Sequence, residues 1–131
     1  MTLEILPQKF TVCKVAQVSA SQMEGDFCFV GKTDREISLV CPTALVPLQT
    51  LAREDGWRGF RIRGTLDFSL VGILSRISKI LAEAEIGIFA ISTYDTDYIL
   101  FKEVQLEQVI YALERQKYEI VLQETASGYN L

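Results

Sequence analysis

Side chains able to do catalytic chemistry are few in this sequence of 131 residues. It has no histidine, so the usual general base of Ser-His-Asp and Cys-His catalysis is missing, as is a common zinc ligand. The cysteines Cys13, Cys28 and Cys41 are too widely spaced for a zinc knuckle. Their apolar and β-branched neighbours favour small buried side chains on strands. The sequence therefore predicts a chain without enzymatic activity, metal or cofactor.

The aspartates Asp67, Asp95 and Asp97 are the other groups whose spacing suggests chemistry. A hard cation needs about six oxygens or more in a dense loop, which this sequence does not have. An acid–base pair needs a cleft, and nothing in the sequence indicates one. Turns and helix caps are an alternative role for these residues, because aspartate bonds readily to nearby backbone.

One basic cluster, around Trp57, raises the question of nucleic acid. It consists of Arg53, Arg58, Arg61 and Arg63, but the formal net charge is −4 and the sequence pI is about 4.8. A nucleic-acid surface needs a broader basic field, so an ion-paired or solvated strand face is favoured. The sequence also shows neither a signal-peptide pattern nor an apolar run near the ~20 residues of a membrane helix. We therefore expect a cytoplasmic protein with no nucleic-acid or membrane partner.

The elements that must position these residues are clearest in the second half. Alternating and three-four apolar spacings predict strands and helices in turn. The expected elements are a strand at 57–64, a helix at 70–84 with Ser69 as N-cap, strands at 86–93 and 97–102, a helix at 106–117 and a strand at 118–122. This order is the split βαβ pattern of a ferredoxin-like α+β fold.

The first half is expected to have the same order of elements in a reduced form. We expect a strand at 9–15, a hairpin from strands at 26–30 and 36–41, and a short helix at 43–54 interrupted by Pro47. The segment at 16–25 has room for little more than a turn where a first helix would belong. The predicted organisation is a reduced N-terminal domain at 1–55, a complete domain at 56–123 and a loose tail at 124–131.

Three segments resemble a family of small tandem ACT-domain proteins. They are Ile91-Ser92-Thr93-Tyr94-Asp95-Thr96-Asp97-Tyr98-Ile99-Leu100, Gly64-Thr65-Leu66-Asp67-Phe68-Ser69-Leu70-Val71-Gly72-Ile73-Leu74, and Glu36-Ile37-Ser38-Leu39-Val40-Cys41. That family is similar to the regulatory ACT repeats of aspartate kinases and to cytosolic arginine sensors. The resemblance implies two ferredoxin-like (βαββαβ) ACT domains in tandem, the N-terminal one reduced.

The same resemblance implies amino-acid sensing without catalysis, in a chain that pairs as a homodimer. In the arginine sensors, the ligand touches the loop that opens the first helix and the end of the following strand. Transferred to this sequence, the implied ligand-binding residues are Asp67, Phe68, Ser69, Leu70, Val71, Gly72, Thr93, Tyr94 and Asp97. This chain has Ser69-Leu70 close to where the arginine sensors carry an acidic residue.

Physical chemistry supports that location independently. Unpaired N–H groups at a helix start attract an anion, so the backbone of Leu70, Val71 and Gly72 suits an α-carboxylate. The carboxylates of Asp67 and Asp97 suit an α-ammonium group. Plain helix-cap and turn roles are the alternative for the same residues.

The sequence leaves three functions open. The first is a regulatory module that binds an amino-acid effector and acts through its oligomer or a protein partner. The second is an interaction subunit that has no effector site and docks through its sheet edge. The third is a small enzyme that uses carboxylates, which the missing cleft disfavours.

Overall fold

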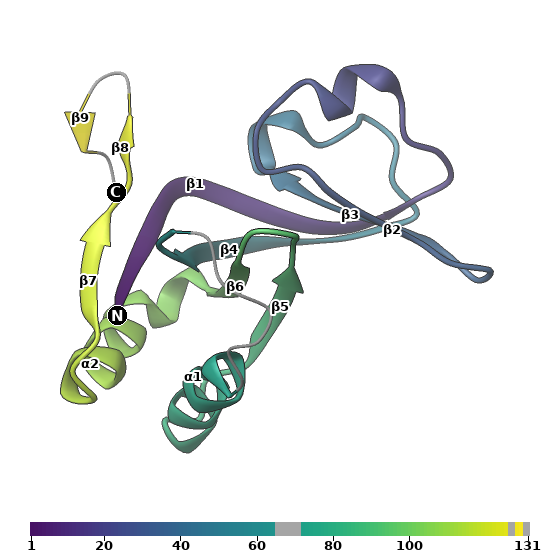
Figure 1. Ribbon diagram of the computed structural model, residues 1–131. Helices are drawn as coiled ribbons and strands as arrows, with labels where there is room; N and C mark the ends of the chain where they lie inside the picture. Colours follow the sequence, from purple (N-terminus) through teal and green to yellow (C-terminus); the bar gives the residue numbers. More distant parts are fainter. Residues whose placement is uncertain (65–71, 126–127, 130–131) are drawn as a thin grey trace. The chain divides into compact units, whose positions relative to one another are not determined.

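The computed structural model describes residues 1–64, 72–125 and 128–129 (Figure 1). The chain divides into two compact units. Unit 1 comprises Met1–Pro7 and Arg58–Leu131, and unit 2 comprises Gln8–Trp57. Two long strands, β1 (Thr2–Val15) and β4 (Ala52–Ile62), are each divided between the two units. Unit 1 thus takes its first strand from N-terminal residues that the sequence grouped with the other half.

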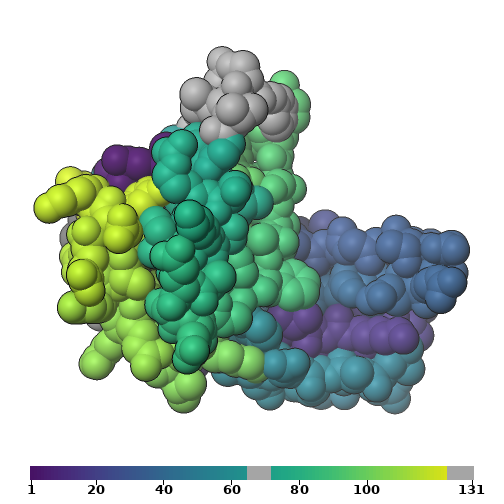
Figure 2. All heavy atoms as spheres, turned by 90° about the horizontal axis from the view of Figure 1, so that it is seen from below, coloured from purple at the N-terminus to yellow at the C-terminus, as the bar shows by residue number. Residues whose placement is uncertain are grey.

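Unit 1 has the predicted order of strands and helices. After β4 come α1 (Ile73–Glu83), β5 (Ile88–Ser92), β6 (Asp97–Lys102), a 3₁₀ turn η3 (Glu103–Gln105), α2 (Leu106–Arg115) and β7 (Glu119–Leu122). Figure 1 shows both helices on the same face of its strands. Figure 2, from below, shows this helical layer from outside. The α+β class expected from the sequence is confirmed.

The strand order of unit 1 differs from the plain βαββαβ pattern. Its strands lie in the order β7, β1, β4, β6, β5, so the first end of β1 separates β4 from β7. β1 pairs parallel with β7, with Leu3 opposite Ile120 and Ile5 opposite Leu122. Sequence analysis missed this part of β1. Its alternation is short, and Pro7, which cannot donate to a ladder, interrupts it.

The core of unit 1 lies between the helices and the strands. Ile77 and Leu81 of α1 and Leu113 of α2 are fully buried, as the three-four spacing predicts. They pack with residues of one alternating strand face, among them Phe60 and Phe101. Burying one such side chain contributes about 1.5–3 kcal/mol, so this core fixes how the strand ends and helix ends of unit 1 are placed.

Unit 2 is built from the second end of β1, the first end of β4 and three short elements. These are η1 (Ala20–Met23), β2 (Phe29–Lys32) and β3 (Ile37–Pro42), followed by the 3₁₀ turn η2 (Thr43–Leu45). The strands lie in the order β2, β3, β1, β4. Leu51 N–H donates to the Lys14 carbonyl at 2.7 Å where β4 approaches β1.

The short helix predicted at 43–54 is wrong. Only η2 is helical there, and β4 starts at Ala52. Val46 has an extended backbone, with φ −63° and ψ 135°. It precedes Pro47, and a residue before proline is driven out of the helical region by its ring. The remaining residues cannot nucleate a helix of useful length before the strand begins.

The two units share a series of elements that recur sixty residues apart. β3 (Ile37–Pro42) and η2 (Thr43–Leu45) correspond in this way to β6 (Asp97–Lys102) and η3 (Glu103–Gln105). The turns before these strands match as well. Thr33 N–H donates to the Glu36 carbonyl at 2.9 Å, and Thr93 N–H to the Thr96 carbonyl at 2.8 Å.

The C-terminal segment, expected to be a loose tail, contains a small hairpin. β8 (Glu124–Thr125) pairs antiparallel with β9 (Gly128–Tyr129). None of the helices in the described residues combines the length and apolar character needed to cross a membrane.

Candidate functional site

The hairpin between β5 and β6 carries three of the predicted ligand-binding residues, Thr93, Tyr94 and Asp97. The Thr93 hydroxyl donates to the Thr96 carbonyl at 3.0 Å, inside the turn. The Asp97 carboxylate accepts a hydrogen bond of 2.6 Å from the Ser92 hydroxyl on the facing strand. Tyr94 stands at the tip with 81% of its surface exposed. Thr93 and Asp97 therefore organise the hairpin, and Tyr94 offers its ring to solvent.

Thr96 holds this hairpin against the end of β4. Its side chain is buried, at 7% exposure, and its hydroxyl donates to the Ile62 carbonyl at 2.8 Å. Ile62 is the last residue of β4, the strand that precedes the helix-opening loop in the sequence. The structure thus places the hairpin turn where the chain leaves β4. The sequence motif suggested a turn role for Thr96 but not this contact with Ile62.

Gly72 is the one residue of the predicted helix-opening group that the structure describes. It is the N-cap of α1, with a left-handed backbone at φ 81°, and its carbonyl accepts the Arg76 N–H at 2.9 Å. The helix therefore begins at Ile73, with Gly72 as its N-cap. A positive φ suits glycine, which has no Cβ to clash. The other five predicted residues, Asp67, Phe68, Ser69, Leu70 and Val71, lie outside the described residues.

The described residues bring the hairpin and the end of β4 together, and they place Gly72 at the start of α1. Among them, no hydrogen bond joins Gly72 to Thr93 or Asp97. Gly64, just after β4, also has a positive φ, at 88°. Gly64 and Gly72 therefore both have a backbone conformation that favours glycine.

A polar network that sequence analysis did not find lies on the strands of the same unit. Arg61 Nε donates to the Glu4 carboxylate at 3.2 Å, and Arg61 Nη1 donates to the Tyr98 hydroxyl at 3.3 Å. Burial alone would lower the pKa of Arg61, but the hydrogen bonds and charges of Tyr98 and Glu4 outweigh it and raise this pKa. Arg61 therefore stays charged. Glu4 lies in the part of β1 that the sequence pattern did not indicate, and its pairing with Arg61 depends on the strand order.

The three cysteines gather in the interior of unit 2. Cys13 and Cys41 are 3% and 1% exposed, and Cys28 packs against the same cluster. Burial is the main cause that raises the pKa of all three thiols, that of Cys41 to about 11. Thiols with raised pKa values are poor nucleophiles at neutral pH. In the part of the chain that the structure describes, no group of acidic, cysteine or histidine residues is arranged to hold a metal ion.

Together these features define an α+β unit whose polar groups shape a hairpin and a helix start, with no recognisable catalytic constellation among the described residues. A family model, the ACT domain, matches residues 52–115, which span β4 to α2. The segment from β4 to α2 is therefore similar to an ACT domain.

Solved structures extend the likeness beyond the matched residues. A protein from Agobacterium tumefaciens is 27% identical, with a TM-score of 0.85 over 95% of this chain and 94% of that one. The ligand-free regulatory subunit of aspartate kinase from Thermus thermophilus is 9% identical, with a TM-score of 0.62 over 88% and 96%. Aspartate kinase from Synechocystis is 13% identical, with a TM-score of 0.68 over 95% of this chain and 28% of that one. The two kinase structures share the fold. None of the curated proteins compared with this sequence matches it.

Proposed function

We propose that this chain is a non-catalytic regulatory module that binds an amino acid in its ACT domain. Its ACT-domain match and its likeness to an aspartate kinase regulatory subunit support a regulatory, ligand-binding role. The observation that carries the proposal is the Thr96–Ile62 hydrogen bond of 2.8 Å. It fixes the hairpin of Thr93 and Asp97 on the strand end that leads to the helix-opening loop.

The proposed site combines residues from two segments of the chain. The loop contributes Asp67, Phe68, Ser69, Leu70, Val71 and Gly72, and the hairpin contributes Thr93, Tyr94 and Asp97. Backbone N–H groups at the helix start suit the α-carboxylate of the amino acid. Asp67 and Asp97 suit its α-ammonium group, and the exposed Tyr94 ring can cover its aliphatic part. In this proposal the amino acid replaces water around side chains already ordered by the hairpin.

The proposal includes a tandem arrangement, with a reduced ACT-like domain in the first half and a complete one in the second. The boundaries expected from the sequence are 1–55 and 56–123, followed by the tail at 124–131. Its support is the repeat of threonine turn, strand and 3₁₀ turn sixty residues apart, at 33–45 and 93–105. The compact unit Gln8–Trp57 has η1, of four residues, where the complete domain has α1.

We further propose that the module works in the cytoplasm as a homodimer, through which it signals to a protein partner. The three free thiols are consistent with a reducing compartment. β5 lies last in its strand order, and its partly exposed apolar residues leave one side available for pairing. A second copy that adds to this strand would cover it.

Thermal unfolding of the purified chain with each of the twenty amino acids tests the proposal. A ligand at about 100 times its dissociation constant stabilises the native state by about 2.7 kcal/mol, which is a shift of several degrees at this size. We expect a selective shift for one amino acid or one chemical group of them. If none of the twenty shifts the midpoint at millimolar concentration, the amino-acid site is refuted. The interaction subunit that docks through β5 would then be the better account.

A further inference from the structure

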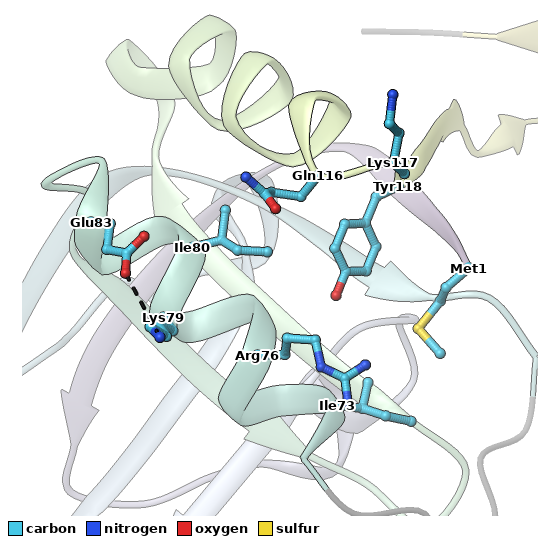
Figure 3. A pocket seen from close by; sticks show the side chains of 9 residues that line it. All are labelled: Met1, Ile73, Arg76, Lys79, Ile80, Glu83, Gln116, Lys117 and Tyr118. Carbon is cyan, nitrogen blue, oxygen red and sulfur yellow. Dashed lines mark ion pairs between the residues drawn. The ribbon is translucent and has the colours of Figure 1, made fainter.

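A cavity of about 450 Å³ opens on the helical layer of unit 1. In Figure 3, α1 forms one wall, the segment from Gln116 to Tyr118 forms the other, and Met1 closes one end. Its volume lies within the range of small-molecule sites, about 300–1,000 Å³. Its lining includes none of the described residues proposed above for the amino acid, although Ile73 directly follows Gly72 in the chain.

Positive charge predominates in this cavity. Its lining holds three cationic side chains, Arg76, Lys79 and Lys117, against one carboxylate, Glu83. Lys79 and Glu83 form an ion pair of 4.0 Å one turn apart on α1, so they largely offset each other. Lys117 extends away from the opening in Figure 3. Among the described residues Arg76 has no ion-pair partner, so it is the cation left to face a ligand in the open cavity.

A second polar group faces Arg76 across the cavity. The half-buried Tyr118 directs its hydroxyl toward the Arg76 guanidinium in Figure 3. A guanidinium presents parallel N–H groups that fit a carboxylate or phosphate in two-point contact, and a phenol can donate a third hydrogen bond. Ile73 and Met1 give the same space an apolar side.

We propose that this cavity binds a small organic oxyanion, with one carboxylate or phosphate head and a short apolar body. The head lies between Arg76 and Tyr118, and the body lies against Ile73 and Met1. An amino-acid zwitterion is disfavoured here, because its ammonium group would meet the excess of positive charge. The site therefore adds a second class of ligand to this chain, independently of whether an amino acid binds at the hairpin.

Heteronuclear NMR titrations of the full chain test this with three ring-matched probes: benzoate, phenyl phosphate and the neutral benzamide. We expect at least one anion to cause saturable shifts at the backbone resonances of Arg76 and Tyr118, and benzamide to cause none. The apparent affinity should fall as sodium chloride is added, because partly exposed charges are screened. Comparing the two anions shows whether the head is carboxylate or phosphate. If neither anion saturates, or benzamide binds equally well, the proposal is overturned.

Three variants assign the binding to the cavity. Arg76→Met should weaken binding of the anion by about tenfold or more, equal to about 1.4 kcal/mol, and Tyr118→Phe should weaken it less. Arg35→Met is the matched control, because it removes the same charge from an exposed loop of unit 2. Arg76 is exposed, so its variant should unfold at the same temperature as the parent chain. Full affinity in Arg76→Met, or an equal loss in Arg35→Met, would reject this site.

Discussion

At the scale of single residues, Asp97 illustrates how one side chain can serve both fold and ligand. Its carboxylate already accepts a hydrogen bond from Ser92, at 2.6 Å. An ionised carboxylate has further acceptor sites, so that bond leaves capacity for an ammonium group. Sequence analysis could name Asp97 from the motif, but it could not see that Ser92 positions it, because that contact depends on the register of β5 with β6.

Asp97→Ala and Ser92→Ala together separate these two roles. If Asp97 receives the α-ammonium of the effector, its alanine variant should lose about tenfold or more in affinity, a loss of about 1.4 kcal/mol. Ser92→Ala removes the hairpin hydrogen bond and keeps the carboxylate, so its loss should be much smaller. Calorimetric titration with the amino acid found in the thermal screen measures both. Equal losses in the two variants would mean that Asp97 only supports the hairpin.

The buried thiol of Cys41 makes stability depend on alkaline pH. Its folded-state pKa is raised from 9.0 to about 11, so the unfolded chain releases this proton first. The stabilisation from the protonated thiol is complete below pH 9 and is lost as pH rises from about 9 to about 11. Urea unfolding across that range should show a shallower loss of stability for Cys41→Ala than for the parent chain. Parallel curves for the two proteins would contradict the assigned burial effect.

At the scale of elements, the spacing of apolar residues predicted the helices and strands that bury one face against a single partner layer. The strand predicted at 97–102 coincides with β6, and the helices predicted at 70–84 and 106–117 correspond to α1 and α2 with shorter ends. Their apolar spacings reflect burial against one partner layer. The first part of β1 was missed and the helix at 43–54 was wrong. In both places a proline interrupts the local pattern, because Pro7 lies within β1 and Pro47 drives Val46 out of the helical region.

The N-terminal strand should be essential to the stability of unit 1. Leu3 is fully buried between strands and helices, so Leu3→Ala should destabilise the fold by about 2–5 kcal/mol. Leu48→Ala is the control, because Leu48 is fully exposed at 105% and its truncation should cost about 0.5 kcal/mol or less. Urea denaturation followed by circular dichroism compares them. A Leu3→Ala variant as stable as the control would exclude this strand from the core.

At the scale of the whole molecule, pairing through the free side of β5 is the main expectation. Ala90 is exposed on this strand, and a charge there opposes strand addition without entering the core. We expect the parent chain to elute as a dimer and Ala90→Lys as a monomer, in size-exclusion chromatography with light scattering. A parent chain that is monomeric at every concentration, or an Ala90→Lys variant that remains dimeric, would exclude this interface.

The candidate site was predicted from sequence to the extent that it depends on contiguous motifs. Thr93, Tyr94 and Asp97 lie in one short segment, so a resemblance could identify them together. The anchoring of Thr96 to Ile62 joins residues far apart in the chain, and so does the pairing of Glu4 with Arg61. Contacts of that kind depend on strand order, and β1 enters unit 1 between β4 and β7, which no local pattern indicates.

The measurement that tests the central claim most directly is an NMR map of the amino-acid effector on the full chain. We would titrate the isotope-labelled protein with the amino acid that gives the largest thermal shift. Our account predicts saturable changes concentrated at Gly72, Thr93 and Asp97, with little change at Arg35 in unit 2. Saturable changes elsewhere with none at those three residues would contradict the proposed site, and no saturable change at all would contradict amino-acid binding itself.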